Sequence, residues 1–183
     1  MTKFIIGADE VFLTIIDVQT RLAAAMLHKE KVTKNISHLI ELSKMLSVPL
    51  IVTEQYPKGL GITIPELKDI LPSLDILEKI SFSCCGESSF LQAVKSTGRK
   101  TAILTGMETH VCVLQTCLDL LNAGYNVHVV KDAICSRDDQ NRDTAIELMR
   151  DAGAVITCTE TVLFQLLKVA GTEEFKTISK RIK

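Results

Sequence analysis

The sequence contains no tryptophan, and aromatic residues make up only 4% of its 183 residues. Proteins that stack nucleic acid bases use exposed aromatic rings, so a stacking platform is not expected. An excess of charge of one sign is also missing, because 21 basic and 22 acidic residues leave a formal net charge of −1. Balanced charge gives no general attraction to nucleic acid or to anionic membranes. Binding to nucleic acid is therefore not predicted.

Long hydrophobic runs are missing as well. No apolar stretch approaches the roughly 18 to 20 residues that a membrane-crossing helix needs. Residues Met1 to Glu10 lack the apolar core of a secretory signal and the Arg- and Ser-rich, acid-poor character of a transit peptide. We therefore expect a cytoplasmic protein that does not contact membranes, and a mitochondrial location stays open.

The six cysteines form no Cys-x-x-Cys pair and no Cys/His spacing typical of a zinc site. Without a secretory signal, reduced thiols are expected rather than disulfides. We predict no metal and no cofactor. The cysteines are Cys84, Cys85, Cys112, Cys117, Cys135 and Cys158.

Apolar, β-branched segments alternate with amphipathic segments along the chain. Strands joined by helical crossovers form a parallel sheet with helices on both faces. We predict an α/β fold, a three-layer α/β/α sandwich with a doubly wound six-stranded sheet in the order 3-2-1-4-5-6. Residues 1–171 form this domain, and residues 172–183 a charged helical tail or partner-contacting arm. The predicted strands are 10–16, 49–53, 75–80, 101–105, 126–130 and 154–157, and the longer predicted helices are 32–46, 87–97, 109–122, 138–150 and 161–169.

The segment from Gly106 to Cys112 carries the strongest functional signal. It follows the fourth predicted strand and opens the next helix, which places Cys112 on a first helical turn at the carboxyl end of a strand. The N–H groups and partial positive charge of a helix N-terminus stabilise a thiolate and can hold an oxyanion. We therefore expect Cys112 to be a nucleophile that is ionised near neutral pH.

Two further polar residues stand at the ends of predicted strands. Ligands of doubly wound sheets bind at the carboxyl ends of the strands, where Asp17 follows the first strand and Lys79 ends the third. A lysine side chain can span most of the roughly 10 Å between these strands. His110 is a poor base for Cys112, since two helical residues at this spacing point about 200° apart. We favour Asp17 as the base. The alternatives are that Asp17 only caps a turn, that Lys79 is only solvated, and that Cys112 only fills the core.

Three motifs resemble those of the isochorismatase-like cysteine hydrolases. They are Ile-Asp17-Val-Gln, Glu-Lys79-Ile-Ser-Phe-Ser and Gly-Met-Glu-Thr-His-Val-Cys112, and the segment from Val52 to Gly61 is similar to the isochorismatase domain-containing proteins. The resemblance implies that Asp17, Lys79 and Cys112 form a catalytic triad.

By the same resemblance, the peptide bond between Met107 and Glu108 is expected to be cis. The backbone N–H groups of Glu108 and Cys112 are then expected to form the oxyanion hole. A small-molecule substrate and a homo-oligomer (a dimer, a tetramer or larger) are also implied.

Two departures narrow the activity that the resemblance implies. Relatives that hydrolyse nicotinamide hold a metal through an Asp and histidines after the second strand, and residues 54–63 contain no histidine. Relatives that cleave the vinyl ether of isochorismate have no cysteine at the nucleophile position. The leading hypothesis is hydrolysis of an amide or other C–N bond through a thioester, with Gln55, Tyr56, Phe82 and His110 as substrate-binding candidates. The alternatives are a vinyl-ether hydrolase, a non-enzymatic interaction protein on this scaffold, and a ribonuclease-associated role.

Overall fold

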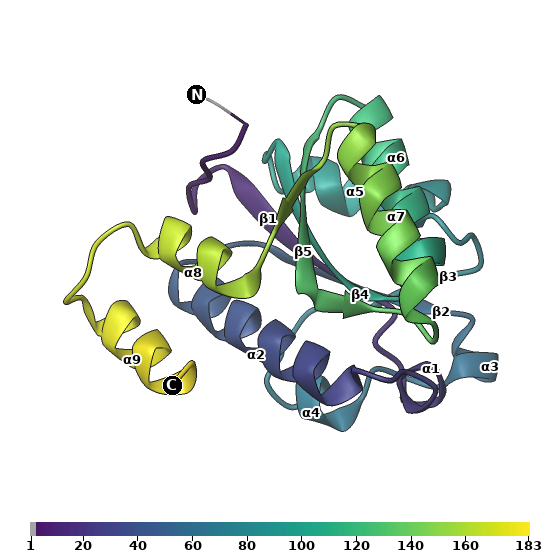
Figure 1. The fold of residues 1–183 in the computed structure, drawn as a ribbon, viewed down its shortest axis with the longest axis horizontal. Helices are drawn as coiled ribbons and strands as arrows, with labels where there is room; N and C mark the ends of the chain where they lie inside the picture. The colour runs from purple at the N-terminus through teal and green to yellow at the C-terminus, as the bar shows by residue number, and fades with distance from the viewer. Residues whose placement is uncertain (1–2) are drawn as a thin grey trace.

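The computed structural model describes residues 3–183 and places a six-stranded parallel sheet between two layers of helices (Figure 1). The sheet order is β3-β2-β1-β4-β5-β6, which confirms the predicted order and fold class. The strands are β1 (Val11–Ile16), β2 (Leu50–Gln55), β3 (Leu77–Lys79), β4 (Thr101–Met107), β5 (Asn126–Cys135) and β6 (Val155–Thr157).

The central strands β1 and β4 are buried along their whole length. Their near-continuous apolar, β-branched sequence is typical of strands covered on both faces. The sheet order reverses between these two strands, because β2 pairs with one side of β1 and β4 with the other. The carboxyl ends of β1 and β4 therefore form the switch point where a ligand site is expected.

Helices cover both faces of the sheet. One core cluster packs against α2 (Lys29–Met45), α4 (Pro65–Lys68), α8 (Thr159–Leu167) and α9 (Glu173–Arg181). A second cluster lies on the opposite face, under α5 (Ser88–Ser96), α6 (Leu114–Asn122) and α7 (Asp139–Asp151) (Figure 1). Two short helices, α1 (Thr20–Ala24) and α3 (Pro57–Leu60), complete the structure, and the sequence patterns do not predict them.

Several elements differ in length from the predicted ones. β2 and β4 each continue two residues further, to Gln55 and Met107, and β5 continues five residues further, to Cys135. The exposed Lys131 and the polar Asp132 interrupt the apolar run of β5, which conceals its second half in the sequence. A break in register between β4 and β5 at Leu104/Gly106 separates the two halves.

The C-terminal segment, predicted as a tail or arm, is a packed helix. α9 contacts α2 and α8, and its Ile178 is fully buried in the first core cluster. Thr172 caps the helix by accepting a hydrogen bond from the N–H of Phe175 at 3.1 Å. Residues 172–183 therefore share the core of the domain.

Gly106 shows why β1 and β4 approach closely at the switch point. Its φ is +118°, and a Cβ atom there would collide with the backbone of Ile16. Only glycine fits this conformation and this contact. Within residues 3–183, no helix has both the length and the apolar character needed to cross a membrane.

Candidate active site

Asp17 lies directly after β1 and is fully buried. Its backbone is left-handed, with φ at 54°. Ile16 pairs with Thr53 in the neighbouring strand, and this register brings the Thr53 hydroxyl to Asp17. The hydroxyl donates a hydrogen bond to Asp17 Oδ1 at 2.7 Å, so the carboxylate is held at the carboxyl edge of the sheet.

Lys79 ends the edge strand β3 and reaches Asp17 across the end of β2. Its Nζ forms an ion pair with Asp17 Oδ2 at 2.8 Å, and both side chains are buried. The ammonium also donates to Gln55 Oε1 at 2.6 Å and to the backbone oxygens of Phe82 at 3.0 Å and Ser81 at 3.2 Å. The ammonium is thus enclosed by four oxygen acceptors.

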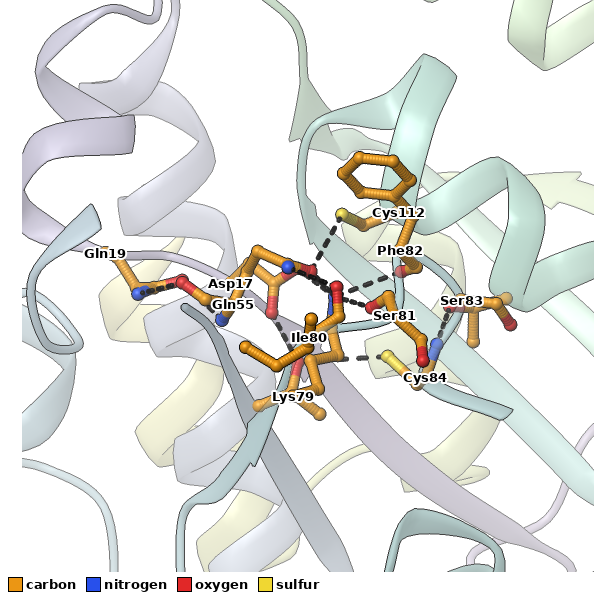
Figure 2. A network of polar contacts seen from close by, with 12 residues as sticks. Asp17, Gln19, Gln55, Lys79, Ile80, Ser81, Phe82, Ser83, Cys84 and Cys112 are labelled. Atoms are coloured by element: carbon orange, nitrogen blue, oxygen red, sulfur yellow. Dashed lines mark hydrogen bonds and ion pairs between the residues drawn. The ribbon is translucent and has the colours of Figure 1, made fainter. Parts of the chain in front are cut away.

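Cys112 approaches this ion pair from the other side of the switch point (Figure 2). It lies in a π-helical turn, Thr109–Val113, that precedes α6, instead of in the first turn of an α-helix. Its thiol donates a long hydrogen bond to Gln55 Oε1 at 4.0 Å, and this is the same oxygen that accepts from the Lys79 ammonium. Three residues that are far apart in the sequence therefore meet at one point.

The environment of Cys112 contradicts the expectation of a sulfur that is ionised near neutral pH. The residue is only 5% exposed, and burial raises the pKa of its thiol well above the usual range. The charge of Asp17 raises this pKa further, while the Lys79 ammonium lowers it. The loss of solvation raises the thiol pKa more than the nearby helix N-terminus lowers it. The resting residue is therefore a thiol.

Burial and charge act against each other on the Asp17–Lys79 pair. Burial raises the pKa of the Asp17 carboxyl, and the Lys79 ammonium and the Thr53 hydroxyl lower it, with a net rise. Burial lowers the pKa of Lys79, but the charge of Asp17 and its hydrogen bond raise it, with a net rise above the usual value. The raised pKa of Asp17 favours its neutral form, whereas the raised pKa of Lys79 favours its charged form. Because four acceptors surround the ammonium, we take the pair to be charged at neutral pH.

Gln19 is a residue of this site that the sequence analysis did not select. Its side chain accepts a hydrogen bond from the Gln55 N–H at 2.8 Å and donates one to the Gln55 carbonyl at 3.0 Å. It also donates to the carbonyl of Gly61. Gln19 therefore fixes the end of β2 against the segment after β1. The motif Ile-Asp17-Val-Gln contains this residue, two positions after Asp17.

The turn between β4 and α6 contributes Glu108 and His110. The peptide bond between Met107 and Glu108 is cis. The Glu108 carboxylate accepts hydrogen bonds from the Arg137 side chain at 3.1 Å and from the Arg137 N–H at 3.0 Å. His110 Nδ1 lies 2.9 Å from Ser136 Oγ. Both contacts join this turn to the residues after β5, on the side of Cys112 away from Lys79.

The other two substrate-binding candidates follow β2 and β3. Tyr56 and Phe82 are 52% and 56% exposed. The N–H of Tyr56 bonds to the Lys79 carbonyl at 2.9 Å, and the carbonyl of Phe82 accepts from the Lys79 ammonium, so their backbones belong to the site. Figure 2 shows the Phe82 ring on the same side of the network as Cys112. Gln55, the remaining substrate-binding candidate, lies at the centre of the network (Figure 2).

Metal ligation finds no support in the arrangement of side chains. Across residues 3–183, no group of three or more His, Cys, Asp or Glu side chains is placed to hold a metal ion. The groups around Asp17 that could donate electron pairs are already engaged with the Lys79 ammonium and the Thr53 hydroxyl. The polar contacts at the site are therefore made within the protein.

Sheet order and site together define a doubly wound α/β protein that holds a buried ion pair and a cysteine at its switch point. A family model described as the isochorismatase domain matches residues 11–161. This match covers all six strands, and the chain belongs to the isochorismatase family. The family resemblance inferred from the three motifs is thereby confirmed.

Similar proteins span nearly the whole chain. The secreted isochorismatase effector Isc1 of Phytophthora sojae is 42% identical over 93% of this chain and 83% of its own length. The structure of the MAR1 ribonuclease of Caenorhabditis elegans is 39% identical, with a TM-score of 0.90 over 97% of this chain and 91% of that one.

Two structures of YcaC proteins are also similar, each at 26% identity. The first, from Pseudomonas aeruginosa, contains covalent acrylamide and has a TM-score of 0.92 over 99% of this chain and 93% of that one. The second, from Escherichia coli, is described as an octameric hydrolase of unknown specificity and has a TM-score of 0.91 over 97% and 90%.

Proposed function

We propose that the protein hydrolyses an amide or other C–N bond of a small molecule through a thioester on Cys112. The observation that carries this proposal is the place of the Cys112 thiol beside a buried ion pair: its Sγ is 4.0 Å from Gln55 Oε1, which accepts from Lys79, and Lys79 is paired with Asp17 at 2.8 Å. A nucleophile beside a base that a third group orients is the arrangement used in covalent catalysis.

In the first half of the reaction, Asp17 accepts the thiol proton as the sulfur attacks the carbonyl carbon. The C–N bond then breaks, and the proton moves from Asp17 to the departing nitrogen, which leaves as a neutral amine. In the second half, Asp17 takes a proton from water, and the resulting hydroxide attacks the thioester. The acid leaves and the proton returns to the sulfur, so the enzyme is regenerated with atoms and charges balanced.

The pKa shifts of Asp17 and Cys112 favour transfer of the thiol proton to Asp17 and its later return. Burial raises the pKa of Asp17, which makes the carboxylate a stronger base towards a thiol whose own pKa is high. The Lys79 ammonium opposes both rises, so it keeps Asp17 ionised and favours the thiolate as it forms. The N–H groups of Glu108 and Cys112 are the proposed donors to the oxyanion.

The similar proteins support a small neutral substrate and a homo-oligomer. Acrylamide, which is covalently held in the Pseudomonas aeruginosa YcaC structure, is a small uncharged electrophile. The Escherichia coli relative is octameric, and we propose that this chain also forms a homo-oligomer. A cytoplasmic location remains our prediction, although the Phytophthora relative is described as secreted.

The alternative functions have less support from the site. Vinyl-ether hydrolysis does not need the thiol that lies at the centre of this arrangement. A ribonuclease role, suggested by the description of the Caenorhabditis elegans relative, would require attraction to a polyanion, and the chain has a net charge of −1. A purely structural or interaction role gives no reason for burying an ion pair next to a thiol, which costs solvation energy.

A panel of small amides and ureido compounds tests the proposal. Each compound is incubated with the protein, and intact-mass spectra are searched for an acyl adduct that peptide mapping places on Cys112. The matched control is Cys117→Ala, which removes a buried cysteine of α6. We expect an adduct in the wild type and in Cys117→Ala and none in Cys112→Ala. Turnover of any compound by Cys112→Ala would contradict the proposal.

A further inference from the structure

The contacts of Gln55 suggest a role that differs from substrate binding. Its side-chain oxygen makes the shortest of the four contacts of the Lys79 ammonium, at 2.6 Å. The same oxygen lies 4.0 Å from Cys112 Sγ. One neutral acceptor therefore stands between the cation and the sulfur of the proposed reaction (Figure 2).

The position of this oxygen is fixed from three directions. The backbone N–H and carbonyl of Gln55 are both bonded to Gln19, at 2.8 and 3.0 Å. The side-chain amide nitrogen donates to the Ile80 carbonyl at 2.7 Å. Because that nitrogen is engaged, the amide cannot turn without losing a hydrogen bond, and its oxygen stays directed at Lys79.

The ammonium has three protons to share among its acceptors. Two acceptors, the carbonyls of Ser81 and Phe82, belong to the segment that directly follows Lys79. The Asp17 carboxylate and the Gln55 oxygen are the other two, and they come from the residue after β1 and from the end of β2. The Gln55 oxygen is the acceptor that also contacts the Cys112 sulfur, so removing it would leave the ammonium free to turn an N–H towards that sulfur once the thiol is ionised.

We propose that Gln55 is a positioning residue that holds the Lys79 ammonium on Asp17 and away from the Cys112 sulfur, so that the sulfur keeps its proton until a substrate is bound. This inference deepens the proposed function and rests on it. A resting thiol is protected from stray electrophiles and oxidants, since the thiolate is the reactive form. The proton is then moved only when Asp17 and the carbonyl group of a substrate act together.

The test compares two replacements that conserve the shape of the side chain. Gln55→Met removes the acceptor, and Gln55→Glu keeps an acceptor but adds negative charge beside the sulfur. The matched control is Gln165→Met, because Gln165 makes similar amide contacts, to Ile6 and Phe4, far from Cys112 in the fold. Iodoacetamide labels the native proteins between pH 6 and 10, and peptide mapping follows Cys112 separately from Cys85 and Cys158, which are partly exposed.

We expect Gln55→Met to be labelled at Cys112 about tenfold faster at pH 7, which corresponds to a fall of one pKa unit, with the whole pH profile moved to lower pH. Gln55→Glu should be labelled more slowly than the wild type, and Gln165→Met at the wild-type rate. A merely structural role would change the denaturation midpoint and leave the pH profile in place. An unchanged or slower profile in Gln55→Met overturns the inference, and so does an unchanged or faster one in Gln55→Glu.

The same measurement separates this inference from the proposed function. If the wild-type Cys112 is labelled at high pH and the variants do not differ, the inference fails and the proposed function stands. If Cys112 of the native wild type is not labelled at any pH while Cys158 is, and no compound of the amide panel leaves an acyl adduct on Cys112, the nucleophilic role itself fails.

Discussion

The replacement Lys79→Met tests whether the buried ion pair is charged. Methionine has a similar length and no charge, so the variant leaves Asp17 fully buried, with the Thr53 hydroxyl at 2.7 Å as its hydrogen-bond donor. Removing one partner of a buried ion pair costs about 3 to 5 kcal/mol. Because domains of this kind are stable by roughly 5 to 15 kcal/mol, the variant is expected to fold with a much lower stability.

The loss of stability should depend on pH in a defined direction. In the variant, burial still raises the pKa of Asp17, and the ammonium that lowered it is gone. A carboxyl with a raised folded-state pKa favours folding below its unfolded pKa of about 3.9, and this contribution is lost as the pH rises through the folded-state value. In the wild type, Lys79 stays protonated throughout this range, because its pKa is raised. The stability gap between the two proteins should therefore widen from pH 5 to pH 8, by about 1.4 kcal/mol or more.

Urea denaturation followed by circular dichroism, at pH 5 and pH 8 and at one fixed protein concentration, measures this gap. Lys95→Met is the matched control, since Lys95 is exposed at the end of α5. We expect the control to match the wild type at both pH values. A loss below about 1 kcal/mol in Lys79→Met, or a gap that is equal at the two pH values, would refute a charged buried pair.

Three further changes test separate parts of the structure. Asp17→Asn should reduce turnover by about 100-fold or more, the usual effect of losing a general base. It should also speed alkylation of Cys112 at pH 7, because the Asp17 charge raises the thiol pKa. Slower alkylation would contradict this effect of the Asp17 charge. Gly106→Ala should lower the free energy of unfolding by more than about 3 kcal/mol, since its Cβ would collide with the Ile16 backbone, and near-normal urea stability would show that the contact can relax. Thr172→Ala should cost about 1 kcal/mol through loss of the helix cap, whereas an unchanged denaturation midpoint would mean that α9 is not part of the cooperative unit.

Much of the fold could be predicted from the sequence, because apolar periodicity reports burial directly. The β1 run Val-Phe-Leu-Thr-Ile-Ile and the alternation of strands and helices define a parallel sheet with little ambiguity. The short helices α1 and α3 have only five and four residues, so they carry no periodic signal. The second half of β5 was missed because Lys131 and Asp132 are polar, and α9 was separated from the domain because charged residues dominate it around one buried Ile178.

The site shows a different limit. Strand ends identify residues such as Asp17 and Lys79, because the carboxyl edge of a parallel sheet collects them in space. Side-chain contacts such as those of Gln19 and Gln55 depend on atomic positions that no spacing rule gives. The ionisation of Cys112 was predicted wrongly, since the sequence reveals a helix end nearby but not the burial that raises the thiol pKa.

The central claim is that the Cys112 sulfur forms a covalent acyl intermediate with Asp17 as its base. The most direct measurement is rapid-quench mass spectrometry of the wild type and of Asp17→Asn, each mixed with an amide that the wild type turns over. In the wild type, the account predicts an acyl adduct on the Cys112 peptide that forms and then decays as the acid appears. In Asp17→Asn, an adduct that forms should persist, because no base activates the water. Release of acid by the wild type with no adduct on Cys112, under conditions where a stable thioester standard is recovered, would contradict the account.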